Sequence, residues 1–221
     1  MKYIIISIIF LILIYNILEY SFQQLTPINH VNNKKSLSNI HLRTGDIILY
    51  NSCFQYGFDI YKLFCSTPFT HVALVYVHPN GTLYQIETDG KHGNTCTLLN
   101  KQLLQGHVIR QINKPLDQIK MEACVRILLG KKYSYNLWKP FYRKWYPFIP
   151  LPVNSKQVLF KNSFCSELIS LILIKFGVLN FDDSELQPSL VLPGDFSESG
   201  DYILPFVNEY RYGAEILIHS D

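Results

Sequence analysis

The feature that most constrains the fold is a hairpin signal near the middle of the chain. Residues 72–77 are rich in β-branched side chains, and residues 83–88 can return beside them after the turn His78-Pro79-Asn80-Gly81. An Asn-Gly pair between two apolar runs is typical of a tight antiparallel connection. The chain is therefore expected to contain an antiparallel sheet that includes this hairpin.

The remaining elements predict a domain that mixes strands and helices. Apolar residues at helical spacing indicate a helix over residues 116–129 and a stronger one over residues 163–176. Ser163 can cap the second helix and Gly177 can end it. Further elements are expected as a short helix at 54–64 and strands at 47–50, 95–98, 108–112 and 215–218. We therefore expect an α+β fold in which an antiparallel sheet packs on the helix that carries Cys165.

The first residues of the chain differ from the rest. Residues 4–18 are almost wholly Ile, Leu, Phe and Tyr. Extended to Phe22, this segment approaches the ~20 residues that a helix needs to cross a bilayer. A cleaved signal peptide would be followed by small residues in an A-x-A-like pattern, and their absence from the sequence here favours a retained anchor over a signal peptide.

The chain is thus expected to be a single-pass membrane protein, attached through its N-terminal segment. The basic residues Lys34, Lys35 and Arg43, set against Lys2, lean against translocation of the main domain. Residues 23–39 are polar, Asn-rich and without periodicity, which is typical of a linker. Three parts are predicted: a transmembrane or signal-anchor helix at 1–22, a polar linker at 23–39 and a folded domain at 40–221.

Charge and cysteine content exclude several classes of function. The formal net charge is only +3 and the basic residues are scattered, so nucleic acid is not expected as a partner. No CxxC pair or Cys/His ligand spacing occurs, and we expect neither a metal nor a cofactor. With an odd number of thiols at least one is expected to be free, and burial is the default for all but Cys165: Cys53, Cys65, Cys96 and Cys124.

Three residues suggest nucleophilic catalysis. Cys165 lies at the start of a predicted helix, where free N–H groups favour a thiolate and can hold a developing oxyanion. His71 begins a strand, and Glu87 on the return strand is expected opposite it, within one residue of register, with Gln85 or Asp89 as substitutes. Each also has an ordinary interpretation: a buried thiol, a histidine that caps a strand, and a solvated strand residue. Together they form a Cys-His-acid arrangement.

At these residues the sequence resembles the circularly permuted NlpC-type papain-like proteins, the YaeF/YiiX-like group, which has poxviral members. The order of the motifs fits that group, because the strands with the histidine and the polar residue precede the cysteine helix. The resemblance covers about residues 40–201, and its segments are Arg43-Thr44-Gly45-Asp46-Ile47-Ile48, Phe69-Thr70-His71-Val72-Ala73-Leu74-Val75, Glu87, Gly130-Lys131-Lys132-Tyr133-Ser134-Tyr135, Phe164-Cys165-Ser166-Glu167-Leu168-Ile169 and Gln187-Pro188-Ser189-Leu190-Val191-Leu192-Pro193-Gly194-Asp195.

The resemblance implies a permuted papain-like fold and a cysteine hydrolase that cleaves an amide or ester bond through an acyl-thioester. Cys165 would attack, His71 would take and return the proton, and Glu87 would orient His71. The substrate would be a small amide, a peptide or a lipid. Two alternatives remain open: a lipid acyltransferase or phospholipase of the same fold, akin to the lecithin:retinol acyltransferase-like branch, or a catalytically inactive membrane-attached binding protein.

Overall fold

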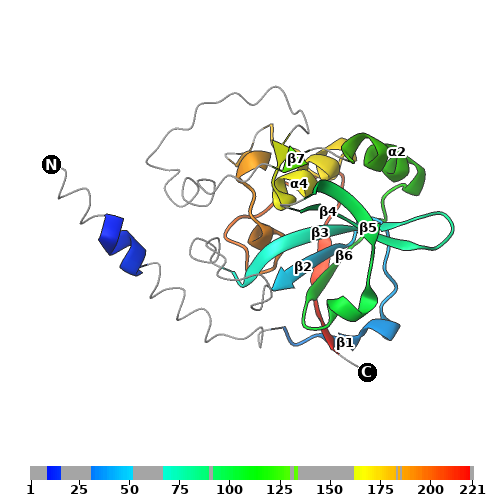
Figure 1. Cartoon of the computed structure of the whole chain (residues 1–221), viewed down its shortest axis with the longest axis horizontal. Helices are drawn as coiled ribbons and strands as arrows, with labels where there is room; N and C mark the ends of the chain where they lie inside the picture. The colour runs from blue at the N-terminus through cyan, green and yellow to red at the C-terminus, as the bar shows by residue number, and fades with distance from the viewer. Residues whose placement is uncertain are drawn as a thin grey trace.

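A seven-stranded sheet forms the centre of the molecule in the computed structural model (Figure 1). The structure describes residues 9–15, 31–51, 67–89, 92–129, 132–133, 162–182, 184 and 186–219. The strand order is β1-β9-β6-β2-β3-β4-β5, and neighbouring strands run antiparallel except for the pair of β1 and β9, which is parallel. The strands are β1 (Lys34–Ser36), β2 (Ile47–Asn51), β3 (Phe69–Val77), β4 (Leu83–Asp89), β5 (Gly93–Leu98), β6 (Val108–Ile112) and β9 (Tyr212–His219). A separate parallel pair joins β7 (Lys132–Tyr133) to β8 (Asn162–Ser163).

The predicted hairpin is confirmed as β3 and β4. Leu74 pairs with Ile86 and Val77 with Leu83. The turn closes with a hydrogen bond from the His78 N–H to the Thr82 carbonyl at 2.9 Å. Gly81 has a φ of +86°, a conformation that a residue with a Cβ atom rarely adopts, which explains the glycine at this position.

Two α-helices accompany the sheet: α2 (Gln118–Leu128) and α4 (Cys165–Lys175). Asp117 caps α2 by accepting a hydrogen bond from the Lys120 N–H. The prediction that Ser163 caps the second helix is wrong, since Ser163 lies in β8 and α4 begins at Cys165. Short 3-10 helices complete the described elements: η1 (Leu37–Asn39), η3 (Lys101–Leu104), η5 (Pro188–Leu190) and η6 (Pro193–Phe196).

The end of α4 follows the prediction. Gly177 has a φ of +67°, and the Val178 N–H turns back to the Leu173 carbonyl at 2.9 Å. This is the hydrogen bond of a glycine-terminated helix, which satisfies a carbonyl that the helix leaves open.

The sheet has an apolar core on each face. Side chains alternate between faces along a strand, so Ile47 and Leu49 of β2 face one core and Ile48 faces the other. The first core contains the apolar side of α4, with Leu168 and Ile172 fully buried, and α2 lies on the same side of the sheet (Figure 1). Each such side chain stabilises the fold by about 1.5–3 kcal/mol. The expected α+β architecture, with a sheet packed on the helix that carries Cys165, is confirmed.

The predicted linker overlaps the fold. Val31 is buried and β1 pairs with β9 between Lys34 and Leu217, so residues 31–39 belong to the domain rather than to a linker at 23–39. The strand was missed because it is three residues long and two of its side chains are exposed lysines, which leaves no apolar alternation.

The N-terminal segment is described only at residues 9–15, which are helical and carry mostly exposed apolar side chains. Within the described stretches, no helix has both the length and the apolar character to cross a bilayer. The predicted membrane helix at 1–22 otherwise lies outside the described residues, as does the helix predicted at 54–64.

Candidate active site

His71 lies at the start of β3, directly beside Tyr50 of β2 and on the same face of the sheet. Tyr50 pairs with His71 while Asn51 pairs with Phe69, so Thr70 is an extra residue on β3. Such a bulge changes the face to which the following side chains point. Phe69 can therefore lie in the same core as Val72, although the two are three residues apart. The His71 side chain retains 28% exposure.

Glu87 of β4 contacts His71 directly. Its Oε2 lies 2.7 Å from the His71 Nε2. The predicted register is wrong by two residues: continued beyond Leu74 and Ile86, the ladder places Glu87 beside Ala73 rather than beside His71. Diagonal neighbours two residues apart share a face of the sheet, so a long side chain still reaches across.

Two more side chains extend this contact on the same face. The Gln85 Nε2 donates to the Glu87 Oε1 at 2.7 Å, and the Tyr50 hydroxyl donates to the Gln85 Oε1 at 2.7 Å. Gln85 is thus a partner of Glu87 and does not take its place. The side chain of Asp89, the other predicted substitute, lies outside the described part of the structure.

Cys165 is the first residue of α4 and is 2% exposed. Burial by itself would lower the pKa of His71, but the charge of the Cys165 sulfur and a hydrogen bond with it, together with the hydrogen bond and charge of Glu87, raise that pKa to about 10. The structure therefore brings together all three residues predicted from the sequence, and we call Tyr50, His71, Gln85, Glu87 and Cys165 the His71 cluster.

The motif around Cys165 fixes the start of α4. The Ser166 hydroxyl donates to the Val191 carbonyl, and Glu167 accepts a hydrogen bond from the Phe164 N–H. The first intrahelical bond runs from the Leu168 N–H to the Phe164 carbonyl at 2.8 Å. The N–H groups before Leu168 are not used by the helix itself, and such groups bind negative charge at a helix N-terminus.

Tyr50 and His107 are neighbours of the site that sequence analysis missed. The Tyr50 ring centroid lies 5.4 Å from that of His71 and 4.8 Å from that of His107. Burial and then the charge of His71 lower the pKa of His107, which disfavours a second positive charge here. Both residues lie near His71 because β2 pairs with β3 and with β6. No local sequence pattern predicts which strands pair in this way.

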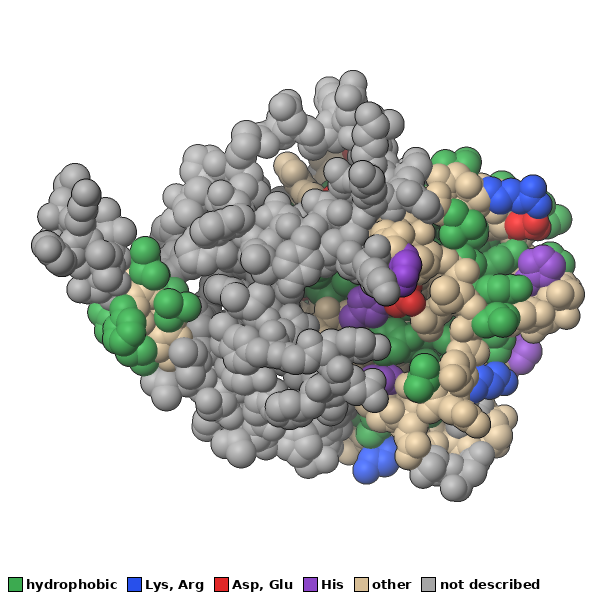
Figure 2. Space-filling model, viewed as in Figure 1, with side chains coloured by type: hydrophobic (Ala, Val, Ile, Leu, Met, Phe, Trp, Pro, Cys, Tyr) green, Lys and Arg blue, Asp and Glu red, His purple; other side chains and the backbone are tan. Residues whose placement is uncertain are grey.

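In Figure 2 histidine side chains lie beside an acidic side chain near the middle of the face drawn, against a hydrophobic background. No group of three or more His, Cys, Asp or Glu side chains among the described residues is arranged to hold a metal ion.

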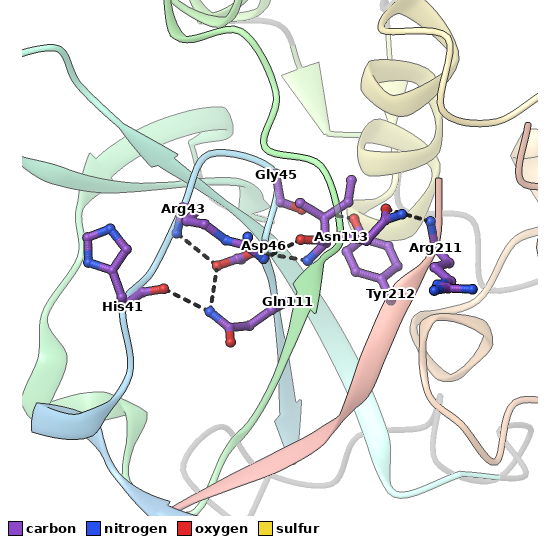
Figure 3. Close-up of polar contacts among 9 residues, drawn as sticks. His41, Arg43, Gly45, Asp46, Gln111, Asn113, Arg211 and Tyr212 are labelled. Carbon is purple, nitrogen blue, oxygen red and sulfur yellow. Dashed lines mark hydrogen bonds and ion pairs between the residues drawn. The ribbon is translucent and has the colours of Figure 1, made fainter. Parts of the chain in front are cut away.

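A second polar cluster lies at the other end of β2 and contains the Thr44-Gly45-Asp46 motif (Figure 3). The fully buried Asp46 carboxylate accepts the Arg43 N–H at 2.8 Å and the Ile112 N–H at 2.9 Å. The Gln111 amide also points to it, and the Tyr212 hydroxyl donates to the Gly45 carbonyl at 3.0 Å. We call Arg43, Gly45, Asp46, Gln111 and Tyr212 the Asp46 cluster.

The fold of the chain is similar to that of solved structures, although its sequence matches no known family. No protein-family model and no curated protein matches the sequence. The fold is similar to the crystal structure of the metalloprotein YiiX from Escherichia coli O157:H7, with 20% sequence identity and a TM-score of 0.43. The match covers 61% of this chain and 66% of the YiiX chain, which is just under two thirds of its length.

Proposed function

We propose that this chain is a cysteine hydrolase of the permuted papain-like type, which cleaves an amide or ester bond through an acyl-thioester on Cys165. The observation that carries the proposal is the position of His71, which contacts both the Cys165 sulfur and the Glu87 carboxylate. A nucleophile, a base and a group that orients the base are the parts required for this chemistry.

Protonation supports the same assignment. A pKa of about 10 keeps His71 in its imidazolium form near pH 7, where the positive ring stabilises a thiolate at Cys165. Burial alone raises the pKa of Cys96 to about 11 and also raises that of Cys124. Among the described cysteines, Cys165 is the one with a histidine partner.

The reaction would proceed in two balanced steps. The Cys165 thiolate attacks the carbonyl carbon, the N–H groups of the first turn of α4 bind the oxyanion, and His71 gives its proton to the leaving amine or alcohol as the C–N or C–O bond breaks. His71 then takes a proton from water, whose oxygen attacks the thioester. The C–S bond breaks and releases the acid together with the free thiolate.

The substrate class is open between a small amide, a peptide and a lipid. The exposed apolar residues of the N-terminal helix, such as Phe10 and Leu11, favour attachment to a membrane. This observation supports the second candidate, transfer or hydrolysis of a lipid acyl chain by the same thiol. Carbonate extraction tests the attachment, because release of all the chain from membranes would contradict a spanning anchor at residues 1–22.

Labelling of the full-length chain with a thiol-reactive acyl probe at pH 7 tests the activity, with the modified cysteine identified by peptide mass spectrometry. We expect label on Cys165, none in Cys165→Ala, and a large loss of rate in His71→Ala. Cys96→Ala is the matched control and should label like the wild type. Label at Cys165 that is independent of His71, or the absence of any label there, would overturn the proposal. Competition by phospholipid vesicles or by peptides then separates the two substrate classes.

A further inference from the structure

We infer that Tyr50 and Gln85 are positioning residues, which hold Glu87 in the orientation that directs one of its carboxylate oxygens to His71. The inference rests on the proposed function, because it concerns how the base at the same site is set. Neither residue contacts the Cys165 sulfur in the structure. Their effect would pass through Glu87, and their hydrogen bonds form a continuous chain from β2 through β4 to β3.

In this series of hydrogen bonds, the geometry allows each polar atom to act either as a donor or as an acceptor, but not as both. Gln85 donates from Nε2 to the Glu87 Oε1 and accepts from the Tyr50 hydroxyl at Oε1, while the Glu87 Oε2 faces His71, and all three distances are 2.7 Å. If the Gln85 amide turned over, its oxygen would face a carboxylate oxygen, which is repulsive. The Tyr50 hydroxyl, as a donor, stabilises the one amide orientation that offers Glu87 a hydrogen.

The Glu87 carboxylate needs the hydrogen bond from Gln85 to keep its orientation. The terminal torsion of a glutamate is broad and roughly two-fold, so a carboxylate held at one oxygen only can turn away from its partner. Gln85 holds Oε1, and this leaves Oε2 toward the His71 Nε2. Two side chains two residues apart on one strand lie on the same face, so the strand itself sets this spacing.

Tyr50 is suited to its role because it remains a neutral donor. Burial and then the charge of Glu87 raise its pKa, so it does not ionise near neutral pH. The titratable groups that face His71 are Tyr50 from β2, Glu87 from β4, Cys165 from α4 and His107 from the segment before β6. Of these, Tyr50 and Glu87 are hydrogen-bonded to Gln85, and Glu87 alone is also hydrogen-bonded to His71 through a carboxylate oxygen.

NMR titration of the full-length chain with isotope-labelled histidine tests the inference. The chain has seven histidines, and the His71 signal is the one lost in His71→Gln. We expect the pKa of His71 to fall by about 1 in Gln85→Met, which removes a hydrogen bond to a charged group, and by about 0.5 in Tyr50→Phe, which removes a neutral one. The double variant should match Gln85→Met, because Tyr50 acts only through Gln85.

Gln111→Met and Tyr76→Phe are the matched controls. Gln111 belongs to the Asp46 cluster, and the buried Tyr76 hydroxyl has no hydrogen-bond partner among the described residues. Both controls should leave the pKa of His71 unchanged. Thermal melting shows whether each variant is folded, and if Gln85→Met does not fold, Tyr50→Phe, which lacks a single oxygen atom, decides the test.

An unchanged pKa of His71 in Gln85→Met and Tyr50→Phe would overturn the inference, as would additive effects in the double variant. These results are separate from the fate of the proposed function. If Cys165 is labelled in a His71-dependent manner while the pKa of His71 ignores Gln85, only the inference fails. If the pKa follows Gln85 while Cys165 stays unlabelled, the proposed function fails and the positioning of His71 stands.

Discussion

Each of the two polar clusters at the ends of β2 contains a carboxylate that is wholly or mostly buried. The two clusters differ in the kind of hydrogen-bond partner that the carboxylate has. Asp46 precedes the strand and Tyr50 lies near its far end, a separation of about 13 Å along a strand that rises about 3.3 Å per residue. In the Asp46 cluster the carboxylate is fully buried and two backbone N–H groups are among its donors. In the His71 cluster the carboxylate of Glu87 is 17% exposed, and the side chains of His71 and Gln85 are among its hydrogen-bond partners.

This difference separates a structural cluster from a titratable one. Backbone donors are fixed by the sheet and cannot gain or lose protons, so the Asp46 carboxylate holds the ends of β2 and β6 in one arrangement. Side-chain partners such as His71 can gain or lose a proton, and for His71 this change of charge is centred at a pKa of about 10. A polar motif of the sequence therefore points to chemistry only when its partners are themselves able to move protons.

Replacing His71 should have the largest effect that distinguishes the two clusters, because it should change the rate of Cys165 labelling much more than the stability. We expect His71→Ala to lower the rate of Cys165 labelling by about 10³-fold, which lies within the range attributed to general acid–base groups. Near pH 10, where the charge of His71 no longer adds to stability, the free energy of unfolding should change by less than about 1 kcal/mol, since the side chain is partly exposed. A rate assay and urea denaturation measure the two quantities. Equal losses in both would abolish the distinction between the clusters.

Replacing Asp46 should give the opposite result. Asp46→Ala leaves two buried N–H groups without their acceptor, and we expect the free energy of unfolding to fall by about 3 kcal/mol. The labelling rate of the folded fraction should stay within about threefold of the wild type, because Asp46 lies about 13 Å along the chain of β2 from Tyr50 of the His71 cluster. Asp46→Asn, which keeps one acceptor oxygen, should lose less stability. A large loss of rate in folded Asp46→Ala would show that the two clusters are coupled.

Gly45→Ala tests the backbone of the Asp46 cluster alone. Gly45 has a φ of +102°, and a Cβ atom there would lie 2.7 Å from the Leu116 Cγ. We expect a loss of about 2 kcal/mol from overpacking and strain. Thermal melting measures it, and Gly81→Ala is the control, because Gly81 also has a positive φ but has open space around it. Equal losses in the two variants would mean that the contact with Leu116 costs nothing.

The pH dependence of stability should also differ between the two clusters. The pKa of His71 is raised from 6.5 to about 10, so its contribution is fully present below pH 6.5 and is lost as the pH rises to about 10. Burial raises the pKa of Asp46, so stability is lost there as the pH rises above about 3.8. Melting temperatures across pH should show that His71→Ala flattens only the alkaline window and Asp46→Asn only the acidic one. If both variants flattened the pH dependence in the same range, the two clusters would not titrate independently, and this prediction would be wrong.

The parts of the fold that were predicted from the sequence are those that local patterns determine. The hairpin follows from its Asn-Gly turn, and β6 has the predicted bounds because its apolar run is short and well delimited. The grouping of Cys165, His71 and Glu87 came from the order of three motifs along the chain. Their catalytic roles remain a prediction.

The parts that were missed depend on long-range pairing. The extra residue Thr70 changes the face of His71, and no local signal distinguishes a bulge from a regular strand here. Tyr50 and His107 join the site through neighbouring strands that are distant in sequence. Ser163 was expected to cap α4 because serine favours that position, but the strand pair of β7 and β8 takes this residue instead.

The placement of α4 after most of the sheet has a consequence for biosynthesis. His71 and Glu87 belong to a hairpin that can form early, whereas Cys165 is added 94 residues after His71. At about 5–20 residues per second, the ribosome adds the thiol roughly 5–20 s after the histidine. The last strand of the sheet, β9, pairs with both β6 and β1 and is made later still. A nascent chain of this order therefore holds the pair of His71 and Glu87 well before Cys165 can join them, and its sheet is completed only after Cys165 has been made.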